Sequence, residues 1–251
     1  MSSNLNIIIM AGGLGKRMES SVPKVLHKIL NKPMIVHVIE ESIKLHPLKI
    51  IIVVGKYRDI IEKTITEYVD INQINLKFVN QPTAIGTGNA IYCCIDELTH
   101  NIHNINTTTL ILSGDVPLLK TDTMLAVITH INKVKLITAE MINSTGYGRI
   151  IELNNKFVKI VEENDCTHEE KEIKKINCGI YAFKTDILCK YLPYISNNNS
   201  QKEYYLTDII EIIKNNEDVE VDMFNIPQYK IHEIIGVNTK AQLADLENSM
   251  I

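Results

Sequence analysis

The chain has 251 residues, of which 45% are hydrophobic and 22% are charged, with a formal net charge of -4 at pH 7. This composition is typical of a globular protein with a buried core, and the lack of excess positive charge argues against nucleic acid as a partner. No apolar run is long enough to span a bilayer, and residues 1–6 lack the positive charge of a signal peptide, so we expect a cytoplasmic protein without membrane contacts.

The cysteines and histidines give no indication of disulfides or of a zinc site. The five cysteines are odd in number and form no C-x-x-C pair, which predicts free thiols in a reducing compartment. The eight histidines do not cluster at the spacing of metal ligands.

Short apolar runs alternate with helical periodicities through the first half of the chain. Residues 49–54 form a continuous apolar run, which suits a sheet buried on both faces. Asn31 is a plausible N-cap, with Pro33 close to the first position of the following helix. The alternation predicts an α/β fold, a Rossmann-like, mostly parallel twisted sheet with helices on both faces. The predicted strands are 7–10, 49–54, 76–80 and 108–112, and the predicted helices are 33–46, 57–69, 87–98 and 121–131.

Beyond residue 142 the pattern changes to shorter strands around a charged segment, residues 162–175. These features predict a small, β-rich, hairpin-bearing lobe that covers an edge of the sheet. A strand ending at residues 234–238, followed by a helix from Thr239, is expected at the C-terminal end. We expect one domain with three successive parts, residues 1–142, 143–226 and 227–251.

The stretch Ile7–Leu26 consists of the first predicted strand and a loop of small residues that follows it. Three glycines, at positions 12, 13 and 15, allow the backbone to approach a ligand closely, and successive N–H groups in such a loop bind anions. Arg17 and Lys24 add positive charge, so the stretch predicts a phosphate-binding loop. It is not a Rossmann fingerprint, because Met18 stands where the third glycine is required, nor a Walker A motif, because Arg17 follows Lys16.

Polar residues follow the predicted strands, at the edge where such sheets bind ligands. The amide of Gln81 can donate and accept hydrogen bonds, as recognition of a pyrimidine edge requires, and Gly86 and Thr87 begin a helix whose N–H groups can face a ligand. Asp115 follows the fourth strand, where a carboxylate facing phosphates requires a cation such as Mg²⁺. The alternatives are a surface loop for Gln81 and a turn for Asp115.

The segment MAGGLGKRM at residues 10–18, with PKVLH at 23–27, resembles the opening signature of the sugar-phosphate nucleotidyltransferases. The resemblance is to their N-acetylglucosamine-1-phosphate uridylyltransferase branch in particular, whose sugar-side motif TGYGRI stands unchanged at 145–150. The chain departs from the family pattern where it has Lys16 for Thr, Ala84 for Gln, Asn89 for His and Ser113 for Tyr.

The resemblance implies transfer of a uridylyl group from UTP to N-acetyl-α-D-glucosamine 1-phosphate, which gives UDP-N-acetylglucosamine and pyrophosphate, with Mg²⁺ as cofactor. It makes residues 1–142 the nucleotide-binding half and residues 143–226 the sugar-binding half. The implied catalytic residues are Arg17 and Lys24; the nucleotide-binding residues are Met10, Ala11, Gly12, Gly13, Gln81, Gly86, Thr87, Ser113 and Gly114; the sugar-binding residues are Gly148, Glu162 and Asn177; and the metal ligands are Asp115 and Asn238.

Other interpretations stay open at this stage. The chain could be a related glucose-1-phosphate uridylyl- or thymidylyltransferase, a cytidylyltransferase, or a nucleotide-sugar-binding protein without activity. For Thr207 and Asp208 we expect a structural role at the start of a helix. Bifunctional bacterial family members continue into a left-handed β-helix with acetyltransferase activity, and because these 251 residues contain no hexapeptide repeat we expect no such activity. The oligomeric state is left open.

Overall fold

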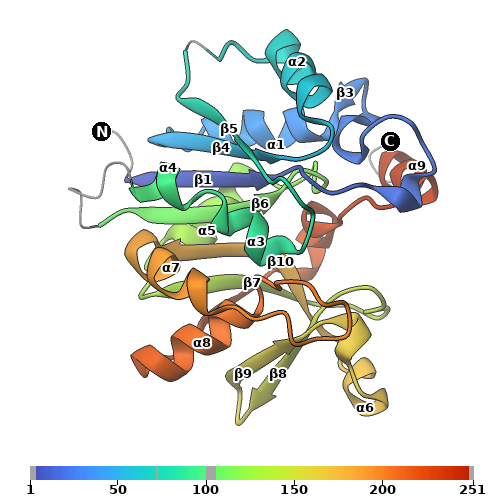
Figure 1. Cartoon of the computed structure of the whole chain (residues 1–251). Helices are drawn as coiled ribbons and strands as arrows, with labels where there is room; N and C mark the ends of the chain where they lie inside the picture. Colours follow the sequence, from blue (N-terminus) through green and yellow to red (C-terminus); the bar gives the residue numbers. More distant parts are fainter. Residues whose placement is uncertain (1–3, 72, 100–105, 249–251) are drawn as a thin grey trace.

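The computed structural model describes residues 4–71, 73–99 and 106–248, and its centre is a nine-stranded sheet (Figure 1). Parallel strands form the middle: β1 (Leu5–Met10) lies between β4 (Lys49–Val54) and β6 (Thr108–Ser113), and β5 (Leu76–Asn80) pairs with β4. These four strands confirm the strands predicted in the first half of the chain. The sheet order is β11 (Asp222–Asn225), β7 (Val134–Glu140), β10 (Lys175–Lys184), β6, β1, β4 and β5.

Helices cover both faces of this sheet, as the apolar runs predicted. Ile7 and Ile9 pack into the core beneath α1 (Met34–Ile43), α2 (Arg58–Tyr68) and α5 (Thr121–Ile128). Ile8 points to the opposite core, which is covered by α3 (Thr87–Tyr92), α4 (Ile95–Thr99), α7 (Thr185–Tyr191) and α8 (Asp208–Glu217). Because successive side chains of a strand point to opposite faces, a run of isoleucines serves both cores.

The second half of the chain adds antiparallel pairing. Strand β10 (Lys175–Lys184) runs antiparallel between β6 and β7 (Val134–Glu140), and β11 (Asp222–Asn225) pairs parallel to β7. Strands β8 (Arg149–Leu153) and β9 (Lys156–Val161) form the predicted hairpin, which joins the sheet where Arg149 pairs with Ile176 of β10. In Figure 1 this hairpin projects at the bottom of the view beside the short helix α6 (His168–Lys171).

Three local predictions were wrong. Asn31 is not an N-cap but has a φ of 63° in the turn between β2 (Lys28–Ile29) and β3 (Lys32–Pro33), and α1 is capped by Pro33. The predicted helix 87–98 is two helices, α3 and α4, because the amide of Cys94 bonds to the carbonyl of Ile91 in a tighter turn.

The predicted strand at residues 234–238 does not form either. The 3-10 helix η5 (Gln228–Ile234) leads into an irregular segment and then into α9 (Lys240–Asn248). In that segment the amide of Val237 donates to the carbonyl of Asp115 at 2.9 Å. The backbone here therefore bonds to the loop after β6 and does not pair with a strand.

All five cysteines are unpaired, which confirms the prediction of free thiols. Within the described ranges, no helix has both the length and the apolar character that crossing a membrane requires.

Candidate active site

The glycine-rich loop after β1 folds back on itself through two short 3-10 helices, η1 (Lys16–Met18) and η2 (Lys24–Leu26). Gly15 has a φ of 59°, and a Cβ at this position would lie 2.7 Å from the Cβ of Lys24. Only glycine combines this backbone conformation with so close an approach. The sequence therefore places Lys24 next to the start of the loop although it lies nine residues further along.

Lys24 belongs to a cluster of polar side chains from three distant segments. Its ammonium forms an ion pair with Oδ2 of Asp115 and donates to Oδ1 of Asn238 at 3.0 Å. Nη2 of Arg17 donates to the same Asn238 oxygen at 3.0 Å. The cluster thus holds two cations, which share the amide oxygen of Asn238, and one carboxylate, and the remaining positive charge suits a polyphosphate. The structure brings together all four residues predicted as catalytic or metal-binding.

A cavity of about 410 Å³ lies beside this loop and holds most residues of the predicted nucleotide site. Gln81 is 6% exposed, and its Nε2 donates to the carbonyl of Gly86 at 3.1 Å and to Oδ1 of Asn89 at 3.0 Å. Gly86 has a φ of 119°, and a Cβ there would lie 2.4 Å from the carbonyl oxygen of Tyr204. The predicted nucleotide residues that line this cavity are Met10, Gly12, Gly13, Gln81, Gly86 and Thr87.

The other three predicted nucleotide residues lie elsewhere. Ala11 and Gly114 line neither cavity: the amide of Ala11 donates to Val53, and that of Gly114 donates to the carbonyl of Met10. Ser113 lines the second cavity described next. The sequence pattern could not tell which residues of the loop face the open space.

The second cavity, of about 240 Å³, holds the three predicted sugar-binding residues, Gly148, Glu162 and Asn177, and also Asp115 and Asn238. Met10 and Thr87 line both cavities, so the two spaces adjoin. The site therefore has two neighbouring compartments, with the Lys24, Asp115 and Asn238 cluster at the smaller one.

Hydrogen bonds fix the polar groups of the smaller cavity. Oε1 of Glu162 accepts from the hydroxyl of Thr207 at 2.9 Å, and burial together with nearby Asp165 raises the pKa of Glu162. Nδ2 of Asn177 donates to the hydroxyl of Tyr181 at 2.6 Å. A Cβ at Gly148 would lie 3.5 Å from Oε2 of Glu162, so glycine leaves room for a ligand beside this carboxylate.

Sequence reasoning missed two residues here. Thr207 stands at the N-cap position of α8 but makes no side-chain capping bond, because its hydroxyl points to Glu162. Arg149 is 1% exposed; it pairs with Oε2 of Glu163 at 2.8 Å and donates to the carbonyl of Tyr147, which holds the loop before Gly148. A charged residue at the start of a strand, directly before two isoleucines, was the available signal for Arg149.

The oxygens of Asp115 and Asn238 also suit a metal. They converge on a single cation, the Lys24 ammonium, and hard oxygen donors of this kind fit Mg²⁺. In the part of the chain that the structure describes, no three His, Cys, Asp or Glu side chains gather as a metal site. Mg²⁺ held by this pair would take its remaining ligands from phosphate and water, as is usual for this ion.

Known proteins are similar to this chain in sequence and in fold. Residues 6–229 match the family model "Nucleotidyl transferase". A protein of Acanthamoeba polyphaga mimivirus named "Probable UDP-N-acetylglucosamine pyrophosphorylase" is 43% identical over 254 residues, covering 99% of this chain and 97% of the relative. The "Bifunctional protein GlmU" of Alkaliphilus metalliredigens is 41% identical over 251 residues, covering 98% of this chain but 52% of that protein. The chain thus spans about half the length of the bacterial relatives.

Among solved structures, a UDP-glucose pyrophosphorylase complexed with UDP-glucose has a TM-score of 0.74 at 16% identity, over 100% of this chain and 98% of the other. At this identity the likeness supports the fold, that of the nucleotide-diphospho-sugar transferases. The family match over most of the chain, together with this fold, shows that the protein belongs to the nucleotidyl transferase family and is a nucleotidyltransferase.

Proposed function

We propose that this enzyme transfers the uridylyl group of UTP to N-acetyl-α-D-glucosamine 1-phosphate, with release of UDP-N-acetylglucosamine and pyrophosphate. The observation that carries the proposal is the pair of adjoining cavities, one beside the glycine-rich loop and one lined by Glu162 and Asn177 together with Asp115 and Asn238. The printed names of the mimiviral and bacterial relatives support the same reaction.

In this proposal the larger cavity takes the nucleoside of UTP and the smaller one takes the sugar. Gln81 contacts the base, and backbone N–H groups of the glycine-rich loop face the phosphates. Glu162 and Asn177 hold the hydroxyl and N-acetyl groups of the sugar, because a carboxylate accepts hydrogen bonds and an amide both donates and accepts them.

The reaction needs no general base. The sugar phosphate has a second pKa near 6, so its oxygen is mostly unprotonated at neutral pH and is already a nucleophile. One phosphate oxygen forms a bond to the α-phosphorus of UTP, and the bond from that phosphorus to the pyrophosphate oxygen breaks on the opposite side. The barrier is charge repulsion and orientation, which fixed positive groups reduce.

Lys24 and Arg17 supply those positive groups. Lys24 neutralises charge near the attacked α-phosphate, and Arg17 stabilises the pyrophosphate that leaves. Mg²⁺ held by Asp115 and Asn238 would add charge neutralisation at the same phosphates. Asn238 accepts hydrogen bonds from both Lys24 and Arg17 and so holds the two cations side by side for the triphosphate.

A pyrophosphate-release assay with Mg²⁺ tests the proposal, using four nucleoside triphosphates in combination with the 1-phosphates of N-acetylglucosamine, glucose and glucosamine. We expect the highest kcat/KM with UTP and N-acetylglucosamine 1-phosphate. Preference for glucose 1-phosphate would assign the protein to a different sugar-phosphate specificity. Absence of release with every pair would contradict catalysis and favour a protein that only binds nucleotide sugars.

A further inference from the structure

We propose that Asn89 is a specificity-determining positioning residue, which fixes the side-chain amide of Gln81 so that the enzyme selects a base with a ring N–H. The inference rests on the proposed use of Gln81 as the base contact. Asn89 itself lines no part of the nucleotide cavity, so it acts through Gln81 and not on the nucleotide.

The orientation of the Gln81 amide follows from its neighbours. The Gly86 carbonyl can only accept a hydrogen bond, so the group 3.1 Å from it must be the NH₂ end of Gln81. The second hydrogen of that NH₂ goes to Oδ1 of Asn89 at 3.0 Å. Both donors of Gln81 are thereby used inside the protein, and a flipped Gln81 amide would set its oxygen against the Gly86 carbonyl and, unless the Asn89 amide turned with it, against Oδ1 of Asn89.

The remaining polar atom, Oε1, is presented to the nucleotide cavity. A Cβ at Gly12 would lie 3.1 Å from it, which places Oε1 over the backbone of the glycine-rich loop. Both Gly12 and Gln81 line the cavity, and within the described part of the chain no group donates a hydrogen bond to Oε1. The cavity therefore offers an acceptor at this point and no donor from Gln81.

An acceptor here distinguishes the pyrimidines. Uracil carries N3–H between two carbonyl groups and can donate to Oε1, and thymine presents the same edge. Cytosine has an unprotonated N3 that would face Oε1 as a second acceptor. An acceptor without a donor costs free energy when it is desolvated, so a fixed Gln81 favours uridine and thymidine nucleotides over cytidine nucleotides.

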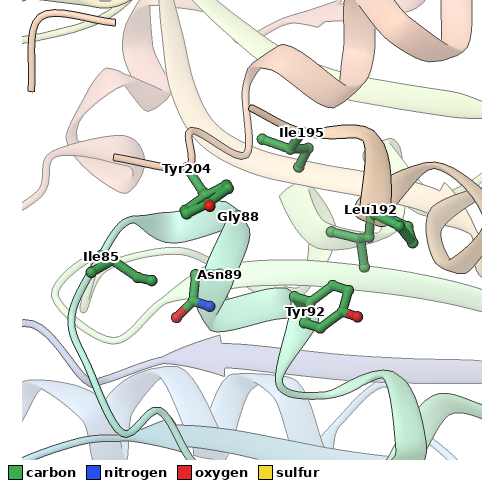
Figure 2. A pocket seen from close by; sticks show the side chains of 8 residues that line it. Ile85, Gly88, Asn89, Tyr92, Leu192, Ile195 and Tyr204 are labelled. Atoms are coloured by element: carbon green, nitrogen blue, oxygen red, sulfur yellow. The ribbon is translucent and has the colours of Figure 1, made fainter. Parts of the chain in front are cut away.

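The backbone of α3, which carries Asn89, is held by a neighbouring segment of the chain. Figure 2 shows Asn89 between Ile85 and Tyr92, bordering a third cavity, of about 270 Å³, that shares no lining residue with the nucleotide cavity. The first turn of α3 is fixed by the amide of Gly88, which donates to the carbonyl of Tyr204 at 2.7 Å. The acceptor that orients Gln81 thus stands on a helix whose position the 204–206 segment determines.

The experiment compares Asn89→Ala, which removes the acceptor, with Asn89→Asp, which keeps one. For each, kcat/KM is measured with UTP, CTP and dTTP, and the dissociation constants of the three nucleotides are measured at equilibrium. In Asn89→Ala we expect the preference for UTP over CTP to fall by about two- to tenfold, the size of one net hydrogen bond, with the ratio of UTP to dTTP unchanged. Asn89→Asp retains the preference, because its charge affects all three triphosphates alike.

Tyr92→Ala is the matched control, because Tyr92 lies on the same helix and borders the same pocket without contacting Gln81. We expect it to leave all nucleotide ratios unchanged. Alanine favours helix at position 89, and circular dichroism checks that each variant folds. As an independent readout, the side-chain NH₂ of Gln81 in the wild-type protein should show NMR signals of a hydrogen-bonded amide before any nucleotide is added.

An unchanged UTP-to-CTP ratio in Asn89→Ala, or an equal loss with all three nucleotides, overturns the inference. A wild-type protein without turnover contradicts the proposed function instead, and the equilibrium ratios then still test the role of Asn89.

Discussion

Lys24 forms the ion pair with Asp115 and one of the two hydrogen bonds to Oδ1 of Asn238, and its side chain is 17% exposed. It therefore joins the loop after β1 to the loop after β6 and to the segment before α9. No other described residue bonds to both Asp115 and Asn238 through its side chain. At the residue scale, this ammonium is the group on which we expect catalysis to depend most.

Replacing Lys24 by alanine should lower kcat by about 10²- to 10³-fold, because a fixed charge at the reacting phosphates is lost. The fold should remain, since Arg17 still reaches Asn238 and the core does not include Lys24. Lys28→Ala, an exposed lysine four residues further on, is the matched control and should keep wild-type kcat. Steady-state kinetics with thermal melting checks both variants, and unchanged turnover in Lys24→Ala would remove its catalytic role.

A second prediction concerns Asp208 and pH. Burial, followed by repulsion from Glu162, Glu211 and Asp165, raises the pKa of Asp208 to about 6 from the ordinary value of 3.8. The folded protein then binds this proton more tightly than the unfolded chain, so the carboxylate costs stability as the pH rises from about 4 to about 6.

Asp208→Asn removes this cost. The shift sets an upper limit of about 3 kcal/mol, and partial exposure of the side chain reduces the expected gain to about 1 kcal/mol at pH 7. The gain should shrink as the pH falls below 6 and disappear near pH 4. Urea unfolding at a series of pH values measures it, and a gain that is constant with pH would contradict the raised pKa.

At the element scale, the start of α3 is where the two parts of the site meet. The amide of Gly88 and the carbonyl of Ile85 both bond to Tyr204, and the hydroxyl of Thr87 accepts from the amide of Leu206 at 3.0 Å. Residues of α3 and residues just before α8 are thus joined by backbone contacts. The segment that forms part of the nucleotide cavity also supports the segment that carries Thr207.

Gly86→Ala tests this junction. The new Cβ would lie 2.4 Å from the Tyr204 carbonyl oxygen, and the φ of 119° is unfavourable for alanine, so the two segments must separate. We expect a loss of about 1–3 kcal/mol in the free energy of unfolding and weaker binding of UTP. Gly13→Ala has no atom within 4 Å of its Cβ and is the control for stability. Equal melting temperatures for the two variants would show that the junction is not tight.

At the scale of the whole molecule, the polar cluster gathers residues from both ends of the described chain, and its side chains bond to one another. Because Lys24 neutralises Asp115, the carboxylate does not depend on a metal for its place in the fold. We therefore expect EDTA to abolish turnover, because turnover requires charge neutralisation at the phosphates. The melting temperature of the free enzyme should stay unchanged. Added Mg²⁺ should restore activity. A marked fall in melting temperature on chelation would mean that the cation supports the fold itself.

Much of this organisation can be predicted from local sequence. Apolar runs identified the four strands of the first half, most clearly β4, where burial of all six residues leaves no polar alternation. The glycines with Arg17 and Lys24 predict a phosphate-binding loop. Turns and the segments between elements were less predictable: Asn31 lies in a turn, and residues 234–238 form no strand. Asn31 is used by the tight turn that pairs β2 with β3, and at residues 234–238 the bond from Val237 to the distant Asp115 replaces strand pairing.

The sequence by itself determined the α/β class, the covered faces of the sheet and the chemical types in the site, because these depend on short-range periodicity and on the residues present. Only the tertiary structure decided which groups meet. Lys24 and Asn238 are 214 positions apart, Thr207 reaches Glu162 and not its own helix, and the Gln81 amide is oriented by Asn89. Such contacts follow from the order of strands in the sheet and from the loops at their carboxyl ends, and no local pattern in the chain encodes them.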